Sequence, residues 1–314
     1  MGFRSLVSLG FVLIPVAVTI SVLLGLQAYR ESRGLNPNPF VSTSNKISSK
    51  NYCQRAFGIT PFTNGQEYTL NPNQWAIPED YDGPGGLCMN VTTYDNGTYP
   101  TETSAAQWSI TWQYPRGPIT QPVHAFPNIK VDTDVFPVEI SKVTAINFET
   151  EWYYGVGDER PDIVDVASLT SVQLDANVAV DMFLDSDPDK ATDTTQAKYE
   201  VMIWLGQYGA STQQIGLADG AVATQIVNGT TFSLFTGVNG LNQNVLTWVA
   251  SDAATGHTNF FADIGPLLQG LTGIGGPTVN DYLGYIAFGS EAYDSASNVT
   301  FYNKHLSLDL VTVS

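Results

Sequence analysis

Apolar and polar residues alternate with a period of two in several segments of the chain. Such alternation places residues of like character on one face of an extended strand. These segments are also rich in β-branched and aromatic residues, which favour strands. The clearest strands are expected at Gln107–Tyr114, Leu174–Leu184, Lys198–Leu205 and Leu283–Tyr293. Further strands are expected at 143–154, 222–227, 231–236, 244–251 and 306–313.

Turn-forming pairs separate these strands, and only one segment has the spacing of a helix. Asn-Gly pairs, which favour tight hairpins, occur at 96–97, 228–229 and 239–240. The expected helix is His257–Leu271, where apolar residues recur at helical spacing around the interruption at 265–266. Many short strands with a single short helix indicate an all-β fold, a β-sandwich or jelly roll.

Three of the expected strands place a carboxylate among aromatic residues on one face. The carboxylates belong to Asp181, Glu200 and Glu291. An inward sandwich face is normally apolar, and burying these charges in it would cost several kcal/mol each. We therefore expect an open concave face, where aromatic rings pack on sugars and raise the pKa of one acid. Each carboxylate could instead be an ordinary strand residue, and Asp181 a structural hydrogen-bonding residue.

The N-terminus is apolar, with no charged residue between Arg4 and Arg30. The segment Leu6–Leu26 exceeds the ~7–15 residues of a typical signal-peptide core and reaches the ~20 that span a bilayer. We expect residues 1–30 to be an uncleaved signal anchor or a cleaved signal peptide. Residues 31–50 are polar and predict a flexible linker, and residues 51–314 predict one globular β domain.

Charge and cysteine usage indicate the environment and exclude one class of partner. The formal net charge is −17 and the sequence pI is near 4.2, which disfavours nucleic acid but leaves a neutral polysaccharide unaffected. We interpret Cys53 and Cys88 as one disulfide, with two buried thiols as the alternative. The N-terminus and the sequons predict an extracellular protein, secreted or tethered by its anchor. The sequons begin at Asn90, Asn96, Asn228 and Asn298.

Motifs for other chemistries are missing from the sequence. The histidines His124, His257 and His305 are scattered without metal-ligand spacing, so neither a metal site nor a cofactor is expected. The sequence contains no His-Glu-x-x-His, no phosphate-binding loop and no Gly-x-Ser-x-Gly elbow. The run at 273–277 ends in proline and is expected to be a loop.

Two glutamate motifs resemble those of glycoside hydrolase family 12. The segment Tyr199–Gly206 (YEVMIWLG) resembles the nucleophile strand of that family, and Phe288–Tyr293 (FGSEAY) resembles its acid/base strand. Asn177–Phe183 (NVAVDMF) resembles a third family segment. The likeness covers residues 51–314. Supporting segments in the expected order are Cys53 with Cys88, Asn73-Gln74-Trp75, Trp112-Gln113-Tyr114 and Asn239-Gly240.

The resemblance implies a jelly-roll β-sandwich of the concanavalin A-like glucanase type, with a substrate groove and hydrolysis with retention. Glu200 would be the nucleophile, Glu291 the general acid/base, and Asp181 would lie beside Glu200. Trp108 and Trp112 fit either the core or the groove. The residues expected to bind substrate are Asn73, Trp75, Trp112, Met202, Trp204 and Asn239.

One departure from the family concerns the segment after the first cysteine, where members often carry an aromatic residue. Here the run is Cys53-Gln54-Arg55-Ala56-Phe57, so either Phe57 fills that role or a distal subsite is weaker. The leading hypothesis is a monomeric, retaining endo-β-1,4-glucanase that acts on cellulose-like or mixed-linkage glucan. The alternatives are a xyloglucan-specific endoglucanase and a non-catalytic carbohydrate-binding wall protein.

Overall fold

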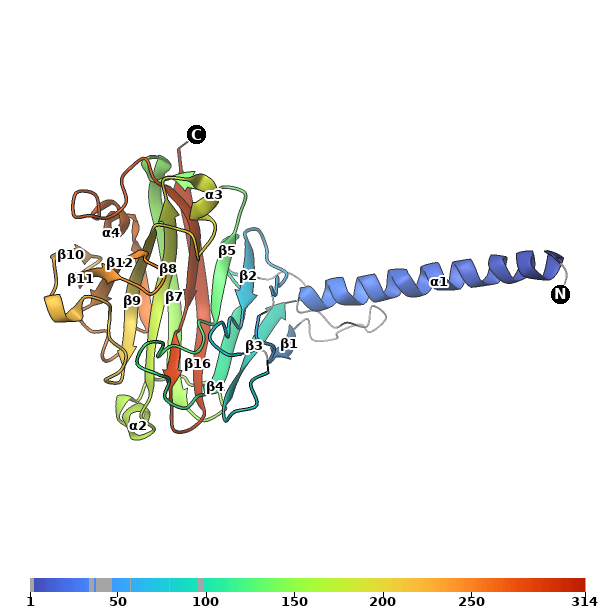
Figure 1. Ribbon diagram of the computed structural model, residues 1–314, viewed down its shortest axis with the longest axis horizontal. Coiled ribbons are helices and arrows are strands. Elements are labelled where there is room, and N and C mark those ends of the chain that lie inside the picture. The colour runs from blue at the N-terminus through green and yellow to red at the C-terminus, as the bar shows by residue number, and fades with distance from the viewer. Residues whose placement is uncertain are drawn as a thin grey trace.

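The computed structural model describes residues 3–33, 37, 47–56, 58–78, 80–94 and 99–313, and the strands among them form two packed β-sheets (Figure 1). One sheet has six strands. Its order is β1 (Ile47–Tyr52), β3 (Gly86–Tyr94), β4 (Gln107–Gln113), β16 (Val299–Thr312), β7 (Val143–Val156) and β13 (Asn259–Asp263). We call it the convex sheet.

The second sheet carries the candidate site, and we call it the groove sheet. Its main path is β10 (Ala223–Val227), β11 (Thr230–Val238), β12 (Asn244–Ala250), β9 (Tyr199–Tyr208), β8 (Asp175–Asp185), β14 (Tyr282–Gly289), β5 (Asn128–Asp132) and β2 (Glu67–Asn71). Off this path, β15 (Ala292–Asp294) pairs with β8, and β6 (Val138–Glu139) pairs with β14. Neighbouring strands are antiparallel except for β12 and β9, which are parallel. The fold is the expected all-β sandwich.

The helices are few, and all but the first are short. They are α1 (Phe3–Ser32), α2 (Val166–Ser171), α3 (Pro188–Ala191) and α4 (Gly265–Gln269), with 3-10 turns at Ile140–Lys142 and Leu217–Asp219. Within the described part of the chain, no helix combines the length and apolar character needed to cross a membrane. The assignment of residues 1–30 to an anchor or signal peptide stays a prediction, as does the linker. Strand β1 begins at Ile47, inside the segment expected to be linker.

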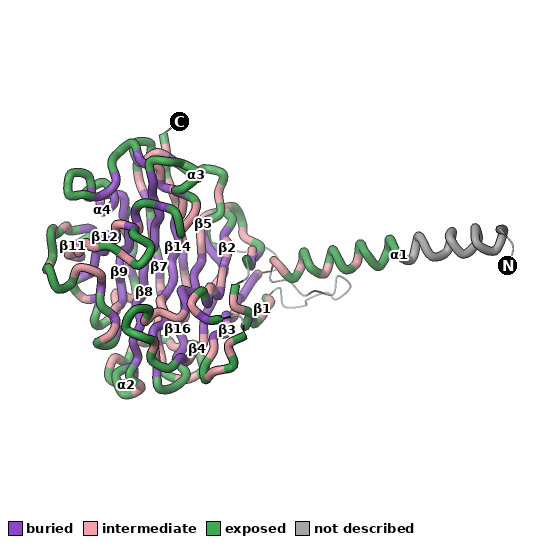
Figure 2. The backbone as a smooth tube through the Cα atoms, in the orientation of Figure 1, coloured by how far each residue is buried: buried purple, intermediate pink, exposed green. Residues whose placement is uncertain are grey.

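Apolar side chains from both sheets fill the space between them, and buried residues follow the strands in Figure 2. Trp108, Trp152 and Trp248 are at most 1% exposed, so they belong to this core. The disulfide between Cys53 and Cys88 is present and confirms that expectation.

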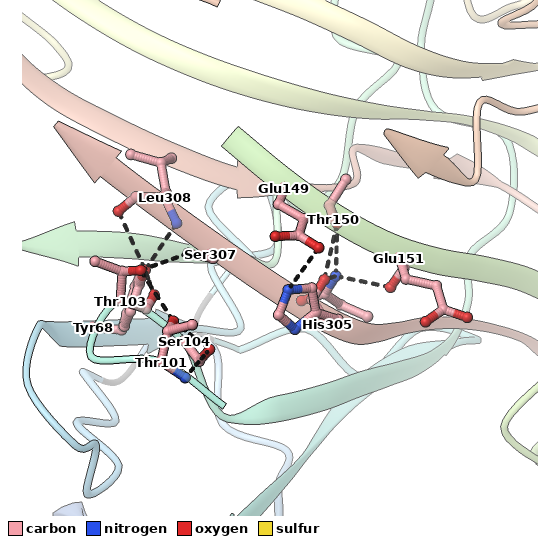
Figure 3. A network of polar contacts seen from close by, with 11 residues as sticks. Tyr68, Thr101, Thr103, Ser104, Glu149, Thr150, Glu151, His305, Ser307 and Leu308 are labelled. Carbon is pink, nitrogen blue, oxygen red and sulfur yellow. Dashed lines mark hydrogen bonds and ion pairs between the residues drawn. The ribbon is translucent and has the colours of Figure 1, made fainter. Parts of the chain in front are cut away.

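Polar contacts also join the two sheets (Figure 3). Tyr68 on β2 of the groove sheet is fully buried, and its hydroxyl accepts a 3.1 Å hydrogen bond from the Leu308 amide on β16. Nearby, the hydroxyls of Thr103 and Ser307 lie 2.7 Å apart. The Tyr68 contact therefore ties β16 of the convex sheet to β2, the edge strand of the groove sheet.

The helix expected at His257–Leu271 is wrong over its first half. Residues Asn259–Asp263 form strand β13, which pairs with β7 and alternates strictly between exposed and buried side chains. The helix α4 begins only at Gly265, where Pro266 is well tolerated because the first helical turn needs no amide donor there. Adjacent Phe260 and Phe261 gave the misleading pattern, because Phe260 is buried while Phe261 is 65% exposed.

The strand expected at Leu283–Tyr293 is interrupted. Strand β14 ends at Gly289 and β15 starts at Ala292, which leaves Ser290 and Glu291 in the junction between them. A second irregularity lies in β9, where the pairing with β8 skips Leu205. Such a bulge shifts the side-chain alternation by one residue. Both irregularities occur in the strands that carry the candidate carboxylates.

Candidate active site

The candidate site lies on the face of the groove sheet that points away from the convex sheet. Gly206 establishes this direction, because a Cβ on it would lie 2.8 Å from the Trp152 ring and 3.1 Å from Val178. Val178 therefore points into the core between the sheets. Since side chains alternate along a strand, Asn177 and Asp181 of β8 point to the opposite, outer face.

Glu200 occupies the neighbouring strand β9 on the same face. Register places Glu200 opposite Phe183 and places Met202 opposite Asp181. The Glu200 side chain is partly exposed, and Asn239 donates a hydrogen bond of 2.8 Å from Nδ2 to Glu200 Oε2. Asn239 follows the last residue of β11, so the hairpin between β11 and β12 supplies this donor.

Glu291 reaches the site from the junction between β14 and β15, and Asn177 of β8 holds it at two points. The Glu291 amide donates to Asn177 Oδ1 at 3.0 Å, and Asn177 Nδ2 donates to Glu291 Oε2. The hydroxyl of Tyr293 donates to the same Oε2 at 3.3 Å. Two donors on one oxygen fix the direction of this carboxyl group.

Asp181 lies on β8, between β9, which carries Glu200, and β14, after which Glu291 follows. Its side chain is 7% exposed, and its Oδ1 has no hydrogen-bond partner among the described residues. Burying an ionised carboxylate in this state is costly, so the protonated form is favoured. Burial raises the pKa of Asp181 well above its ordinary value, and the charges of Glu200 and Glu291 add to the rise.

The two glutamates differ in their electrostatic surroundings. Burial raises the pKa of Glu291 to about 7, and the charge of Glu200 contributes to the rise. Burial also raises the pKa of Glu200, but the hydrogen bond from Asn239 opposes it. The three carboxyl groups are close enough to influence one another, so they titrate as a set. This set favours negative charge on Glu200 and a proton on Glu291.

Comparison with known proteins identifies the family. The sequence pattern of the family described as Glycosyl hydrolase family 12 matches residues 66–310. This chain belongs to glycosyl hydrolase family 12. It is therefore a glycoside hydrolase, and the resemblance drawn from its two glutamate motifs is confirmed.

Curated relatives of this family 12 chain are identical to it at about a quarter of the aligned positions. It is 28% identical over 239 residues to a probable xyloglucan-specific endo-beta-1,4-glucanase A of Aspergillus flavus, covering 76% of this chain and 83% of that protein. It is 26% identical over 230 residues to endoglucanase A of Aspergillus kawachii, covering 72% and 80% respectively.

Solved structures of family 12 proteins share the fold. Endoglucanase 3 of Trichoderma harzianum has a TM-score of 0.64 at 23% identity, covering 86% of this chain and 99% of that one. The catalytic domain of Humicola grisea Cel12A, in complex with a soaked thio cellotetraose, has a TM-score of 0.63 at 24% identity, covering 83% and 99%.

The other residues expected to bind substrate lie beyond β2 or on β9 of the groove sheet, except for Trp112. Trp75 is 54% exposed just beyond β2, where an aromatic ring is free to contact a ligand. Asn73 precedes it in the left-handed conformation, and its carbonyl accepts from the Phe126 amide at 3.0 Å. Met202 and Trp204 are 8% and 1% exposed on β9, with the Trp204 Nε1 donating to the Met202 sulfur at 3.4 Å.

Trp112 is not at the groove face. It lies on β4 of the convex sheet, is 1% exposed, and donates from Nε1 to the Tyr154 hydroxyl at 2.7 Å. Of the two places that the sequence left open, the structure puts this ring in the core. The Tyr154 hydroxyl lies 3.3 Å from Ser290 Oγ, and Ser290 Oγ donates to the Asn177 carbonyl at 2.6 Å. Trp112 therefore ends a buried hydrogen-bonded chain behind Glu291.

Phe57, the candidate for a distal sugar contact, lies outside the described residues. His124 stacks on Tyr114, and its Nδ1 lies 2.7 Å from the carbonyl oxygen of Tyr293, two residues beyond Glu291. His257 contacts Asp252 at 2.6 Å, and His305 faces Glu149 at 3.6 Å (Figure 3). Across the described ranges, no group of three His, Cys, Asp or Glu residues is arranged to hold a metal ion.

A cavity of about 860 Å³ opens at the N-terminal end of β8. Its lining includes Asp175, Gln207 and Asp294 of the groove sheet, Arg116 from a loop, and residues of α2. Asp175 precedes Asn177 by two positions on β8. The cavity is therefore near the residue that holds Glu291, although none of the three carboxylates lines it.

Sequence reasoning assigned no role to Asn177, Tyr293 or Gln243. Asn177 and Tyr293 were detectable in principle, because each shares a period-two face with a candidate carboxylate. Gln243 carries no such signal, because its contact with the site runs through Asn239.

Proposed function

We propose that this family 12 hydrolase is a retaining endo-β-1,4-glucanase in which Glu200 is the nucleophile and Glu291 the general acid/base. The observation that carries the proposal is the unequal environment of the two glutamates. Glu291, with a pKa of about 7, holds its proton in mildly acidic solution, whereas Glu200 receives a hydrogen bond that favours its ionised form. A nucleophile must be charged and a general acid must be protonated.

The reaction then follows in two displacements. Glu200 attacks the anomeric carbon while Glu291 transfers its proton to the departing glycosidic oxygen, which gives an ester between Glu200 and the sugar. Glu291, now ionised, takes a proton from water, the hydroxide attacks the anomeric carbon, and Glu200 leaves as carboxylate. Asp181 remains protonated in its buried position, so it adds no third negative charge.

The roles are tested with Glu200→Gln and Glu291→Gln. Glu200→Gln is expected to lose essentially all turnover while remaining folded. Proton NMR of the first product released by the wild type should show the β anomer. Near-normal turnover by Glu200→Gln, or an initial α anomer, would contradict the proposal.

The proposed substrate is a β-1,4-linked glucan of the cellulose or mixed-linkage type. A neutral polymer suits a protein of net charge −17, and the exposed ring of Trp75 suits packing on a sugar. Xyloglucan is the second candidate, because the Aspergillus flavus and Aspergillus niger relatives are named as xyloglucan-specific. Initial rates on carboxymethylcellulose, mixed-linkage glucan and xyloglucan discriminate between them. A non-catalytic carbohydrate-binding role predicts no new reducing ends on any of the three.

We further propose that the protein acts outside the cytoplasm as a monomer. The disulfide between Cys53 and Cys88 and the sequons support an oxidising compartment. N-terminal sequencing of the protein isolated from its natural source would establish whether the apolar segment is retained as an anchor. Light scattering would measure the oligomeric state.

A further inference from the structure

The donor on Glu200 belongs to an amide whose hydrogens are both used. Asn239 Nδ2 donates to Glu200 Oε2 at 2.8 Å and to Gln243 Oε1 at 2.8 Å. On the other side of the amide, Asn239 Oδ1 accepts from the backbone amides of Leu241 and Gln243, both at 3.0 Å. Asn239 is therefore satisfied by protein groups within its own turn and by Glu200.

The orientation of the Gln243 side-chain amide is fixed by two groups that can only accept hydrogen bonds. It is 3% exposed, and its Nε2 donates to the carbonyl of Thr194 at 3.0 Å and to that of Ala197 at 2.9 Å. Carbonyl oxygens only accept hydrogen bonds, so the Gln243 amide nitrogen must face them. Its oxygen must then face Asn239, and Asn239 must present its nitrogen to Glu200.

We propose that Gln243 is a positioning residue for the nucleophile: through Asn239, it keeps an N–H donor directed at Glu200. The inference rests on the proposed role of Glu200 and extends it to a residue that does not touch the reacting atoms. This series of hydrogen bonds begins at the backbone before β9 and passes through the hairpin between β11 and β12. It ends on the carboxylate, so three segments separated in sequence determine its surroundings.

The other titratable groups that interact with Glu200 bring no positive charge to it. Asp181 on β8 interacts with Glu200, as do Glu291 and Tyr293 beyond β14, and each of these groups is neutral or negative. Among the described residues, Asn239 is the only group that donates a hydrogen bond to the Glu200 side chain. Disturbing its orientation should therefore disfavour the ionised nucleophile.

The first test is Gln243→Met, which preserves side-chain length and removes the amide. The acidic limb of the kcat/KM profile reports ionisation of the free nucleophile. It should move up by roughly one pH unit, because a hydrogen bond to a charged group is being weakened. At the optimum, kcat should fall about tenfold with a smaller change in KM. If Gln243→Met does not fold, Gln243→Glu is the second variant, because a carboxyl group cannot donate to both carbonyls. Its acidic limb is also expected to move to higher pH.

Asn303→Leu is the matched control for loss of a buried amide. Asn303 is fully buried on the convex sheet and donates to the His305 carbonyl at 2.9 Å. This variant should lower stability without moving the acidic limb. A folded Gln243→Met enzyme whose acidic limb coincides with that of the wild type would overturn the inference.

A double-variant cycle tests whether Gln243 acts through Asn239. In the background of Asn239→Ala, adding Gln243→Met should leave the acidic limb where the single Asn239→Ala variant has it. Additive shifts would show that Gln243 acts by another route and would overturn the inference. Full turnover by Glu200→Gln would instead overturn the role of Glu200 as nucleophile, so the two failures are distinguishable.

Discussion

The contact between Asn177 and Glu291 gives a prediction about Glu291, the proposed acid/base, and the size of the expected effect follows from the structure. Asn177 is fully buried, accepts from the Glu291 amide at 3.0 Å through Oδ1, and donates to Glu291 Oε2 through Nδ2. Asn177→Asp keeps the side-chain shape and the acceptor but replaces the donor with a second oxygen. The variant thus removes one hydrogen bond to the carboxylate without creating a cavity.

The direction of the effect follows from which form of Glu291 the bond stabilises. The donor favours the ionised form and holds down a pKa that burial has raised to about 7. A hydrogen bond to a charged group is worth about 1.5–3 kcal/mol, which corresponds to about one to two pKa units. The new carboxyl group adds repulsion in the same direction, and the pair then shares one proton. The pKa of the pair should therefore rise to about 8 or higher.

The assay is the pH dependence of kcat/KM on a soluble glucan. The basic limb, where the general acid loses its proton, should move to higher pH by at least about one unit in Asn177→Asp. Carbon-13 NMR of labelled glutamate gives a direct reading of the same ionisation. Asn147→Asp is the control, because Asn147 is exposed on β7 of the convex sheet and its replacement adds the same charge. A basic limb that stays in place or moves to lower pH in Asn177→Asp would refute the reasoning.

Three further predictions concern stability and binding. Because the pKa of Glu291 in the folded state exceeds its ordinary 4.5, the native state keeps a proton that the unfolded chain loses, and stability falls as pH rises from about 4.5 to 7. Glu291→Gln avoids this loss. In urea unfolding, its free energy of unfolding should exceed that of the wild type by about 1–3 kcal/mol at pH 8 and equal it at pH 4.5. Replacing Cys53 and Cys88 with serine opens a link across 35 residues and should cost about 3–4 kcal/mol in the same assay, and an unchanged midpoint would contradict this. Trp112→Phe should lower the free energy of unfolding by about 1–3 kcal/mol and leave KM unchanged. Trp75→Ala should raise KM several-fold and leave stability unchanged. The reverse result would show that the two rings had been assigned wrongly.

The sequence predicted those features of the fold that depend on local alternation. The strands around Asp181 and Glu200 were detectable because one face is apolar and the other carries the carboxylates. Strands such as β1 and β5 were not expected, because short segments of mixed polarity become strands only when partners pair with them. The failure at Phe260 and Phe261 has the same origin, since two adjacent aromatic residues fit a helical face until pairing with β7 separates them.

The site shows a similar division between local and long-range information. The glutamates could be proposed from short motifs, but their hydrogen-bond partners could not. Asn177 precedes Glu291 by more than a hundred positions, and Asn239 follows Glu200 by 39. Trp112 has a sequence pattern compatible with either face, and its burial and its bond to Tyr154 show that it packs in the core. Contacts of this kind depend on strand order, which period-two patterns do not determine.

Hydrogen bonding alone does not explain the different roles proposed for the two glutamates, because each accepts a bond from an asparagine. The difference lies in the influences on each pKa that those hydrogen bonds oppose. At Glu200, the burial that raises its pKa is opposed by Asn239, whose orientation is held by the Gln243 side chain and by two backbone amides. At Glu291, burial and the charge of Glu200 act together and exceed the bonds from Asn177 and Tyr293. Placing charge on Glu200 therefore stabilises the proton on Glu291, so each group reinforces the state that the other would need in the proposed first displacement.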